Sequence, residues 1–431
     1  YKLTLHHNKL SSLDRDLFYW QEELSYLDLS NNLLTALPPT IFQRTIALRT
    51  LDLSNNLIQE LPDTLFSKLI NVKTLYIASN GLESVSPRLF ENTGSIERLR
   101  LSNNRLTSVD PETFSQMTYL VDLNLANNLI TTLSDGDFKN MSSITVLSLA
   151  RNQISSIDEN VFKNLENINT IDLSGNQITT IHPNYFSRLG KLEILHLDDN
   201  HITDIESGSF QGTFKLLYLG LHYNRLSSLR PRLFEDCREL NPLSLSYNHF
   251  QDLDRDFFEG LGTLRNLYLD GNQIGGLPGN VFKDMWELRR IDLQNNDIRT
   301  IYRDSFYELR DLEDLNLSNN SISSLAEYCF EKLFGLISLD LSDNELVSIT
   351  SENVFYGLNK LSGIKLSGNS LTDLAESSLT DVLDTLKTLE LLKLMFDSTF
   401  VTMDQIRNIA EYWIYQNDTP KSYRKDFKES F

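Results

Sequence analysis

An asparagine returns at a fixed interval along almost the whole chain of 431 residues. From Asn8 to Asn344 the interval is 24 residues, and one interval of 25 leads to Asn369. A phenylalanine stands ten residues after the asparagine in fourteen of the units, the first being Phe18. Such a period is typical of repeat proteins, in which each unit packs only against its neighbours. The chain therefore does not need the several separate cores that its length would otherwise suggest.

Each unit reads LxxLxLxxNxLxxLxxxxFxxLxx, with leucine or another apolar residue at the Leu places. Side chains alternate along a strand, so the leucines of Leu-x-Leu share one face and predict one short strand per unit. Strands separated by 24 residues can only be parallel neighbours, stacked about 4.8 Å apart. The phenylalanines lie in the return segment, whose bulk places the sheet on the concave side. The predicted fold is a curved α/β repeat solenoid.

The repeated asparagine is predicted to be structural. Its amide carries both donors and an acceptor, so it can satisfy backbone groups where the chain turns off the strand.

This frame resembles the leucine-rich repeat superfamily. The 24-residue unit with its phenylalanine row is similar to the extracellular type found in Toll-type receptor ectodomains, in chaoptin and in soluble immune proteins of insect blood. The resemblance covers residues 1 to 395 and implies a horseshoe with a parallel β-sheet on its concave face and a phenylalanine spine on the convex side. The family binds proteins, glycans or lipids, so the ligand has to be argued from the site itself.

We divide the chain into a leucine-rich repeat array, residues 1–395, and a C-terminal helical cap and tail, residues 396–431. The array holds about sixteen repeats, of which the first is truncated, and it ends where Leu394 replaces the repeated asparagine. Apolar residues then follow at helical spacing, namely Met403, Ile406, Ile409, Ala410 and Trp413. They predict a short capping helix that covers the end of the array, as terminal repeats require. A helix that binds a partner is the alternative.

Asp and Glu outnumber Lys and Arg by 59 to 39, which gives a net charge of -20. We therefore expect no nucleic-acid partner, because phosphate recognition needs a basic surface. No apolar run approaches the roughly 20 residues that cross a bilayer, so we expect no membrane span in this chain. The start at Tyr1, without an initiator Met, indicates that a longer gene product extends beyond it.

Cys237 and Cys329 lie nearly four repeats apart, about 18 Å of stacking, which is too far for a disulfide. Both are predicted to be buried free thiols. Free thiols favour an intracellular location, whereas glycosylation sequons favour the secreted or extracellular location that we expect. The sequons begin at Asn140, Asn316, Asn319 and Asn417. A glycan on Asn316 would stand on the concave face.

Serine and alanine dominate the seventh position of the unit, on the predicted concave face, and the exceptions cluster in units nine to thirteen. Aromatic and charged residues gather in the same units, and exposed tyrosines are typical of interface cores. The candidate ligand-binding patch comprises His196, Asp198, Asp199, Tyr218, His222, Tyr223, Tyr247, Tyr268 and Asp270. The alternative to a binding patch is that residue types outside the apolar frame simply vary from coil to coil.

Within this patch, His196, Asp198 and His222 are predicted to share one face of adjacent strands. Two imidazoles and a carboxylate can bind zinc. Charge-assisted pairing on a solvated surface is the simpler interpretation, so we assign no metal and no cofactor. A carboxylate beside histidine favours the imidazolium form, which predicts a pH-sensitive surface.

The sequence holds no glycine-rich phosphate loop and no nucleophile elbow, so we predict that the protein is not an enzyme. The resemblance implies an extracellular recognition protein, in innate immunity or cell adhesion. It would bind another protein or a microbial glycoconjugate through its concave or lateral surface. Two alternatives remain. One is a structural or adhesive glycoprotein that forms homo- or hetero-oligomers through its flanks or C-terminal helix, and the other is an intracellular scaffold.

Overall fold

The computed structural model describes residues 1–383 and residue 385. The chain forms two compact units, Tyr1–Arg225 and Leu226–Phe431, which are described one at a time. The described residues carry sixteen main strands, all parallel and in chain order. Each repeat contributes one main strand, so the predicted parallel-strand solenoid is confirmed. The predicted capping helix, the end of the array near residue 395 and the tail lie outside the described residues.

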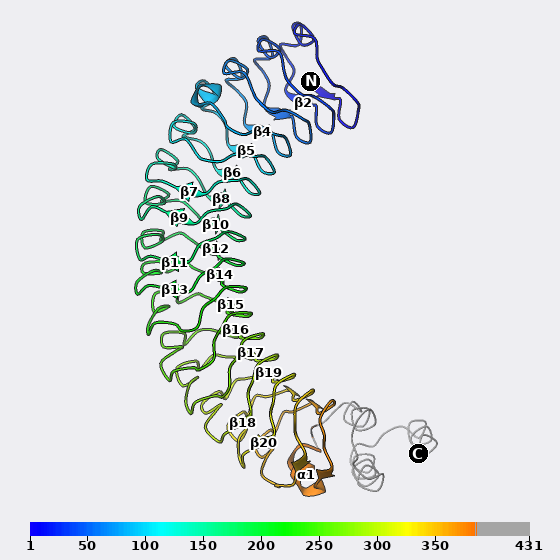
Figure 1. Ribbon diagram of the computed structural model, residues 1–431, viewed down its shortest axis with the longest axis vertical. Coiled ribbons are helices and arrows are strands. Elements are labelled where there is room, and N and C mark those ends of the chain that lie inside the picture. The colour runs from blue at the N-terminus through cyan, green and yellow to red at the C-terminus, as the bar shows by residue number, and fades with distance from the viewer. Residues whose placement is uncertain (384, 386–431) are drawn as a thin grey trace, which may run out of the picture. The chain divides into compact units, whose positions relative to one another are not determined.

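Unit 1 stacks ten main strands, and within it they line the concave side of the coils (Figure 1). The register keeps equivalent residues side by side, for example Leu195 beside Leu219. The main strands are β1 (Lys2–Thr4), β2 (Tyr26–Asp28), β3 (Thr50–Asp52), β4 (Thr74–Tyr76), β5 (Arg98–Arg100), β6 (Asp122–Asn124), β8 (Val146–Ser148), β10 (Thr170–Asp172), β12 (Ile194–His196) and β14 (Tyr218–Gly220).

Unit 2 stacks six main strands in the same way. They are β15 (Leu243–Ser244), β16 (Asn266–Tyr268), β17 (Arg290–Asp292), β19 (Asp314–Asn316), β21 (Ser338–Asp340) and β23 (Gly363–Lys365). Strand β15 is shorter than the others because Pro242 occupies its first place and has no N–H to donate. The side chain of Asn241 compensates in part: its Oδ1 accepts the backbone N–H groups of Arg265 and Asn266 at 3.2 and 2.9 Å.

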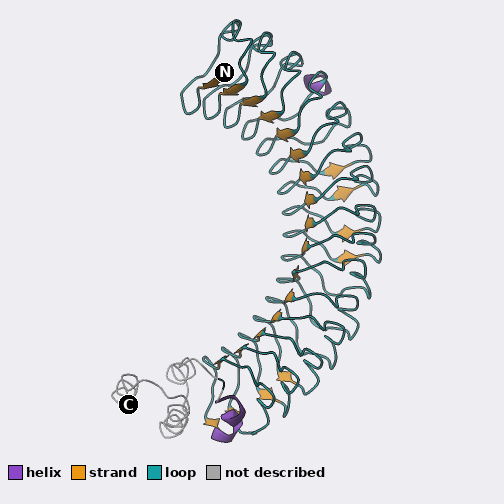
Figure 2. Cartoon of the chain, turned by 180° about the vertical axis from the view of Figure 1, so that it is seen from behind, coloured by secondary structure: helices purple, strands orange, loops and turns teal. Residues whose placement is uncertain are grey.

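Some coils carry a second, two-residue strand on the side opposite the main sheet, which the repeat pattern did not predict (Figure 2). These strands pair in twos because the apolar residues that follow the repeated asparagine also lie in register. In unit 1 they are β7 (Thr132–Leu133) with β9 (Ser156–Ile157), and β11 (Thr180–Ile181) with β13 (Asp204–Ile205). In unit 2 they are β18 (Thr300–Ile301) with β20 (Ser324–Leu325), and β22 (Ser348–Ile349) with β24 (Asp373–Leu374).

The core of each unit consists of the frame leucines and the phenylalanine row. In unit 1 the rings stack from Phe18 to Phe114 and from Phe138 to Phe210, with consecutive centroids 5.9 to 6.4 Å apart. In unit 2 the corresponding distances are 5.5 to 6.2 Å. The return segments are mostly turns, with a short 3₁₀ helix at Pro87–Phe90. In the last described coil the return segment is instead helix α1 (Glu376–Leu383), in which Leu379 takes the phenylalanine place and is buried.

The repeated asparagines form a ladder, as predicted. The Nδ2 group of Asn200 donates to the carbonyls of Leu197 and Asp198 in its own coil, at 3.1 and 3.2 Å, and to that of Leu173 in the preceding coil at 3.0 Å. Its Oδ1 accepts the N–H of Ile178, again in the preceding coil, at 3.1 Å. Each buried asparagine thus satisfies backbone groups of two coils.

Cys237 and Cys329 are both buried thiols that form no disulfide, as predicted. Within the described residues, no helix is long and apolar enough to cross a membrane.

Candidate ligand-binding site

Seven coils end their main strand with Asp or Asn, whose side chain holds the turn that follows. In the coil of β10, Oδ1 of Asp172 accepts the N–H of Ser174 at 3.0 Å and its hydroxyl at 2.6 Å. The same contact to the N–H two residues on is made by Asp28, Asp52, Asn124, Asp292, Asn316 and Asp340. The coils of β12 and β14 have His196 and Gly220 at this place, so they lack this side-chain contact to the following turn.

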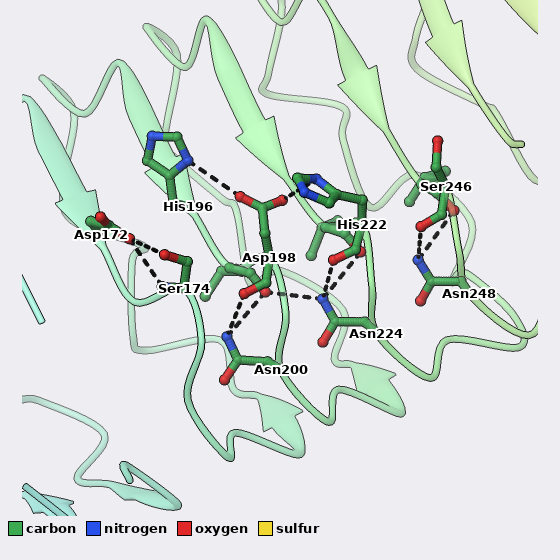
Figure 3. Close-up of polar contacts among 12 residues, drawn as sticks. Asp172, Ser174, His196, Asp198, Asn200, His222, Asn224, Ser246 and Asn248 are labelled. Carbon is green, nitrogen blue, oxygen red and sulfur yellow. Dashed lines mark hydrogen bonds and ion pairs between the residues drawn. The ribbon is translucent and has the colours of Figure 1, made fainter. Parts of the chain in front are cut away.

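The carboxylate of Asp198 lies between two imidazoles (Figure 3). Nδ1 of His196 is 3.3 Å from its Oδ2, and Nδ1 of His222, one coil further on, is 2.6 Å from its Oδ1. The side chain of Asp198 is only 9% exposed, whereas the two histidine side chains are 36% and 34% exposed. The buried carboxylate therefore orients two imidazoles that reach the surface.

Gly220 makes room for this arrangement. In the register of β12 and β14 it is the partner of His196, and a Cβ atom added to it would lie 2.2 Å from both carboxylate oxygens of Asp198. The carboxylate thus occupies the space that a side chain would fill at this position. Sequence reasoning missed Gly220, although a glycine at a place that other coils give to Asp or Asn was a detectable signal.

The pairing shifts the proton affinity of all three groups. Burial acts to raise the pKa of Asp198, but the hydrogen bonds from His196 and His222 outweigh it and hold this pKa below its usual value. The same hydrogen bonds raise the pKa of His196 and of His222 against the opposing effect of burial. The histidines therefore keep their positive charge to a higher pH than free imidazoles would.

Aromatic rings flank the imidazoles. The ring of Tyr218 lies 4.9 Å from that of His196, and the ring of Tyr223 lies 5.3 Å from that of His222 in an edge-to-face contact. Tyr223 is 52% exposed, and Asp199 next to Asp198 is also exposed. We name the six residues of unit 1 the histidine patch: His196, Asp198, Asp199, Tyr218, His222 and Tyr223.

Tyr223 has a strained backbone. The residue before each ladder asparagine has a positive φ, between 51° and 68°, and most coils place Asn, Asp or Gly there. Tyr223 has φ 54° at this position. A bulky residue in the left-handed region is unfavourable, and such strain tends to be kept at functional sites.

The remaining residues of the predicted patch belong to unit 2. Tyr247 has φ 52°, and its ring lies against Gly271, where an added Cβ would be 2.5 Å from a ring carbon. Asp270 accepts a hydrogen bond from the hydroxyl of Ser246. Tyr268 is half-buried on β16. A binding role for these three residues stays a prediction.

The geometry favours pairing over zinc at the histidine patch. Both Nδ1 atoms are turned to the carboxylate that would have been the third metal ligand. Across the residues that the structure describes, no group of three or more His, Cys, Asp or Glu side chains could hold a metal ion.

Three of the four sequons can be located. Asn140 and Asn319 are exposed. Asn316 is half-buried on the main sheet, where its Oδ1 accepts the N–H and the hydroxyl of Ser318 at 3.1 and 2.7 Å. Asn417 lies outside the described residues.

Comparison with known proteins identifies the class. The family model described as "Leucine rich repeat" matches nine overlapping segments between residues 1 and 371, namely 1–58, 46–106, 94–154, 142–202, 190–250, 238–298, 262–322, 287–346 and 310–371. This fold is a scaffold of stacked coils, and the chain belongs to the leucine-rich repeat family. Comparison with curated protein sequences found no matching relative.

Solved structures share the fold. The Toll receptor in the Toll–Spatzle complex of Drosophila matches 87% of this chain and 54% of its own, with a TM-score of 0.76 and 21% identity. A leucine-rich repeat protein of Leptospira interrogans matches 79% of this chain and 90% of its own, with a TM-score of 0.65 and 26% identity. An internalin from Listeria monocytogenes matches 78% and 88%, with a TM-score of 0.56 and 20% identity. The chain spans about half the length of the Toll chains that it matches.

Proposed function

We propose that this protein is a non-catalytic recognition protein that binds another protein through the main sheet of unit 1, with the histidine patch as the centre of the contact surface. The observation that carries the proposal is the exposed ring of Tyr223, held in a strained backbone beside His222, which is one of two imidazoles that a buried carboxylate orients. Exposed aromatic side chains around a rigid polar centre are typical of interface residues that contribute most of the binding free energy.

The Toll chains with a similar fold are in complex with Spatzle. This supports a protein ligand as the first choice over a microbial glycoconjugate, although at 21% identity the likeness extends to the fold alone. The finer assignment to innate immunity or cell adhesion belongs to the same proposal.

The test is affinity capture from native material with the wild-type protein and with Tyr223→Ala as baits. We expect the variant to lose a protein that the wild type retains. Tyr119→Ala is the matched control, because Tyr119 is a 67% exposed tyrosine of the same unit outside the histidine patch. Retention of every captured protein by Tyr223→Ala would argue against the proposal.

We also propose an extracellular location. Asn140 and Asn319 are exposed and available for a glycan, whereas two buried thiols that form no disulfide favour the alternative of an intracellular scaffold. Mass spectrometry of native protein separates the two. Glycan at Asn140 or Asn417 is expected for the extracellular protein, and unmodified asparagine at both would favour the scaffold.

A further inference from the structure

The histidine patch presents hydrogen-bond acceptors when its histidines are neutral. Because Nδ1 of His196 and of His222 faces a carboxylate oxygen, the neutral rings carry their proton on Nδ1 and keep a lone pair on Nε2. Figure 3 shows the second nitrogen of His196 on the side of the ring away from Asp198. A ligand therefore meets two acceptors at high pH. After protonation it meets two N–H donors.

Protonation of the two rings also changes the net charge of the surface around them. Asp172 and Asp198 face His196, and Asp198 and Asp199 face His222, whose pKa the charge of His196 acts to lower. Tyr218 is the other titratable neighbour, and its pKa is raised first by burial and then by Asp198, so its ring stays neutral. With both histidines neutral, Asp172 and the two carboxylates of the patch give this surface a clear negative charge. Protonation of both rings cancels most of it.

The aromatic rings at the patch add a third preference. Tyr218 and Tyr223 lie beside the imidazoles, and the face of an aromatic ring attracts a cation. Acceptors, negative charge and aromatic faces all favour a positively charged donor. The net charge of -20 also favours a basic partner.

We propose that the histidine patch binds a lysine or arginine side chain of the partner protein while both of its histidines are neutral and releases it on acidification, when His196 and His222 become charged donors. This proposal rests on the proposed function and names the chemistry of its partner. Asp198 acts as a positioning residue, because it turns both rings and sets the pH at which they change. Gly220 leaves it the space to do so.

The probe for this inference is a labelled acetyl-tetralysine amide, whose binding is followed by fluorescence anisotropy. If a bound cation lowers the pKa of an imidazole by one unit, full protonation of that imidazole weakens the binding of the cation about tenfold. We therefore expect the wild-type affinity to fall about tenfold or more between about pH 8 and about pH 5.5, across the titration range of histidine. The side-chain NMR signals of His196 and His222 are expected to shift when the peptide is added at the higher pH.

Two variants separate the patch from the rest of the surface. In His196→Gln/His222→Gln, whose side chains do not titrate, the affinity is expected to change by less than about threefold over the same range. His182→Gln is the matched control, because His182 pairs with Glu206 at 2.9 Å outside the patch, and it should behave as the wild type. Thermal melts check that both variants are folded.

Three results would overturn the inference: wild-type affinity that stays constant or rises on acidification, an equally steep pH dependence in the double variant, or imidazole signals that do not respond to the peptide. A rise on acidification would indicate an acidic partner instead. The proposed function is unaffected by these results if the Tyr223→Ala bait fails to retain a protein that the wild-type bait captures. Retention of every captured protein would count against that function separately.

Discussion

The carboxylate of Asp198 fills the place of a side chain on Gly220, since a Cβ atom there would lie 2.2 Å from both of its oxygens. The two residues belong to neighbouring coils, and His222 reaches the same carboxylate from the coil of Gly220. The position of Asp198, and with it the orientation of both imidazoles, therefore depends on the absence of a side chain in the next coil.

Gly220→Ala should displace the carboxylate. We expect the pKa of His196 and of His222 to fall toward that of free imidazole in histidine NMR titrations. The free energy of unfolding should drop by about 1 to 3 kcal/mol, because a buried carboxylate loses its partners. Gly275→Ala is the control, since an added Cβ there meets nothing within 4 Å. Unchanged titration curves in Gly220→Ala would contradict the packing described above.

Asp198→Asn tests the pH dependence of stability. The pKa values of the two histidines are raised in the folded protein. The stability that they contribute is therefore fully present below the pKa of histidine in the unfolded chain, and it is lost as pH rises through their pKa in the folded protein. The pKa of Asp198 is lowered, so its contribution is lost as pH falls through that folded pKa. The stability difference between wild type and variant should therefore be largest between about pH 4 and pH 6.5 and shrink above that range. Urea unfolding at several pH values measures it, and a difference that grows toward pH 9 would refute the assignment.

Asn176→Leu removes a ladder amide. Its Nδ2 donates to the carbonyls of Leu149, Leu173 and Ser174, and its Oδ1 accepts the N–H of Ile154. Buried backbone groups left unpaired cost about 1 to 3 kcal/mol, which chemical denaturation should detect. Gln177→Leu, at the exposed position next to it, is expected to change stability by less than about 0.5 kcal/mol. Equal effects of the two substitutions would show that the amide contributes little.

Tyr223→Asn should stabilise the protein while it weakens partner binding. Asn tolerates the left-handed conformation better than Tyr, and relief of the strain is worth about 1 kcal/mol. Ser79→Asn is the control, because Ser79 has φ 57° at the equivalent position of another coil. It should gain stability with no change in binding. Thermal melts and affinity capture give the two measurements, and a destabilised Tyr223→Asn would remove the strain argument.

The sequence determined the fold because its frame residues repeat with one period. The Leu-x-Leu pairs, the asparagines and the phenylalanines each mark one place in every coil, so the strands, the ladder and the stacked rings could be predicted. The second strands and helix α1 could not, since every coil carries the same apolar frame there and only some coils form these elements. Pro242 in β15 is a similar case, because a side chain of Asn241 replaces backbone contacts in a way that no period reveals.

For the candidate site, the sequence placed Asp198 beside His222 because equivalent positions of adjacent coils are lateral neighbours. It did not reveal that Asp198 is buried, or that it leans over Gly220. Both depend on which side chain is missing from the next coil. Nor did it reveal the strain at Tyr223, because a backbone angle is not visible in a pattern of residue types.

The asparagine ladder has a direction. The amide of Asn200 finds its partners in its own coil and in the coil before it, and Asn8, in the first coil, donates only to Leu5 and His6 of that coil. A newly added coil can thus complete its amide contacts without the coil that comes next. Nascent chains arrested on the ribosome should accordingly gain protease resistance in steps of one coil, and a single late step would speak against this. The ribosome therefore synthesises the coils in the order in which each finished coil can accept the amide contacts of the coil that follows it.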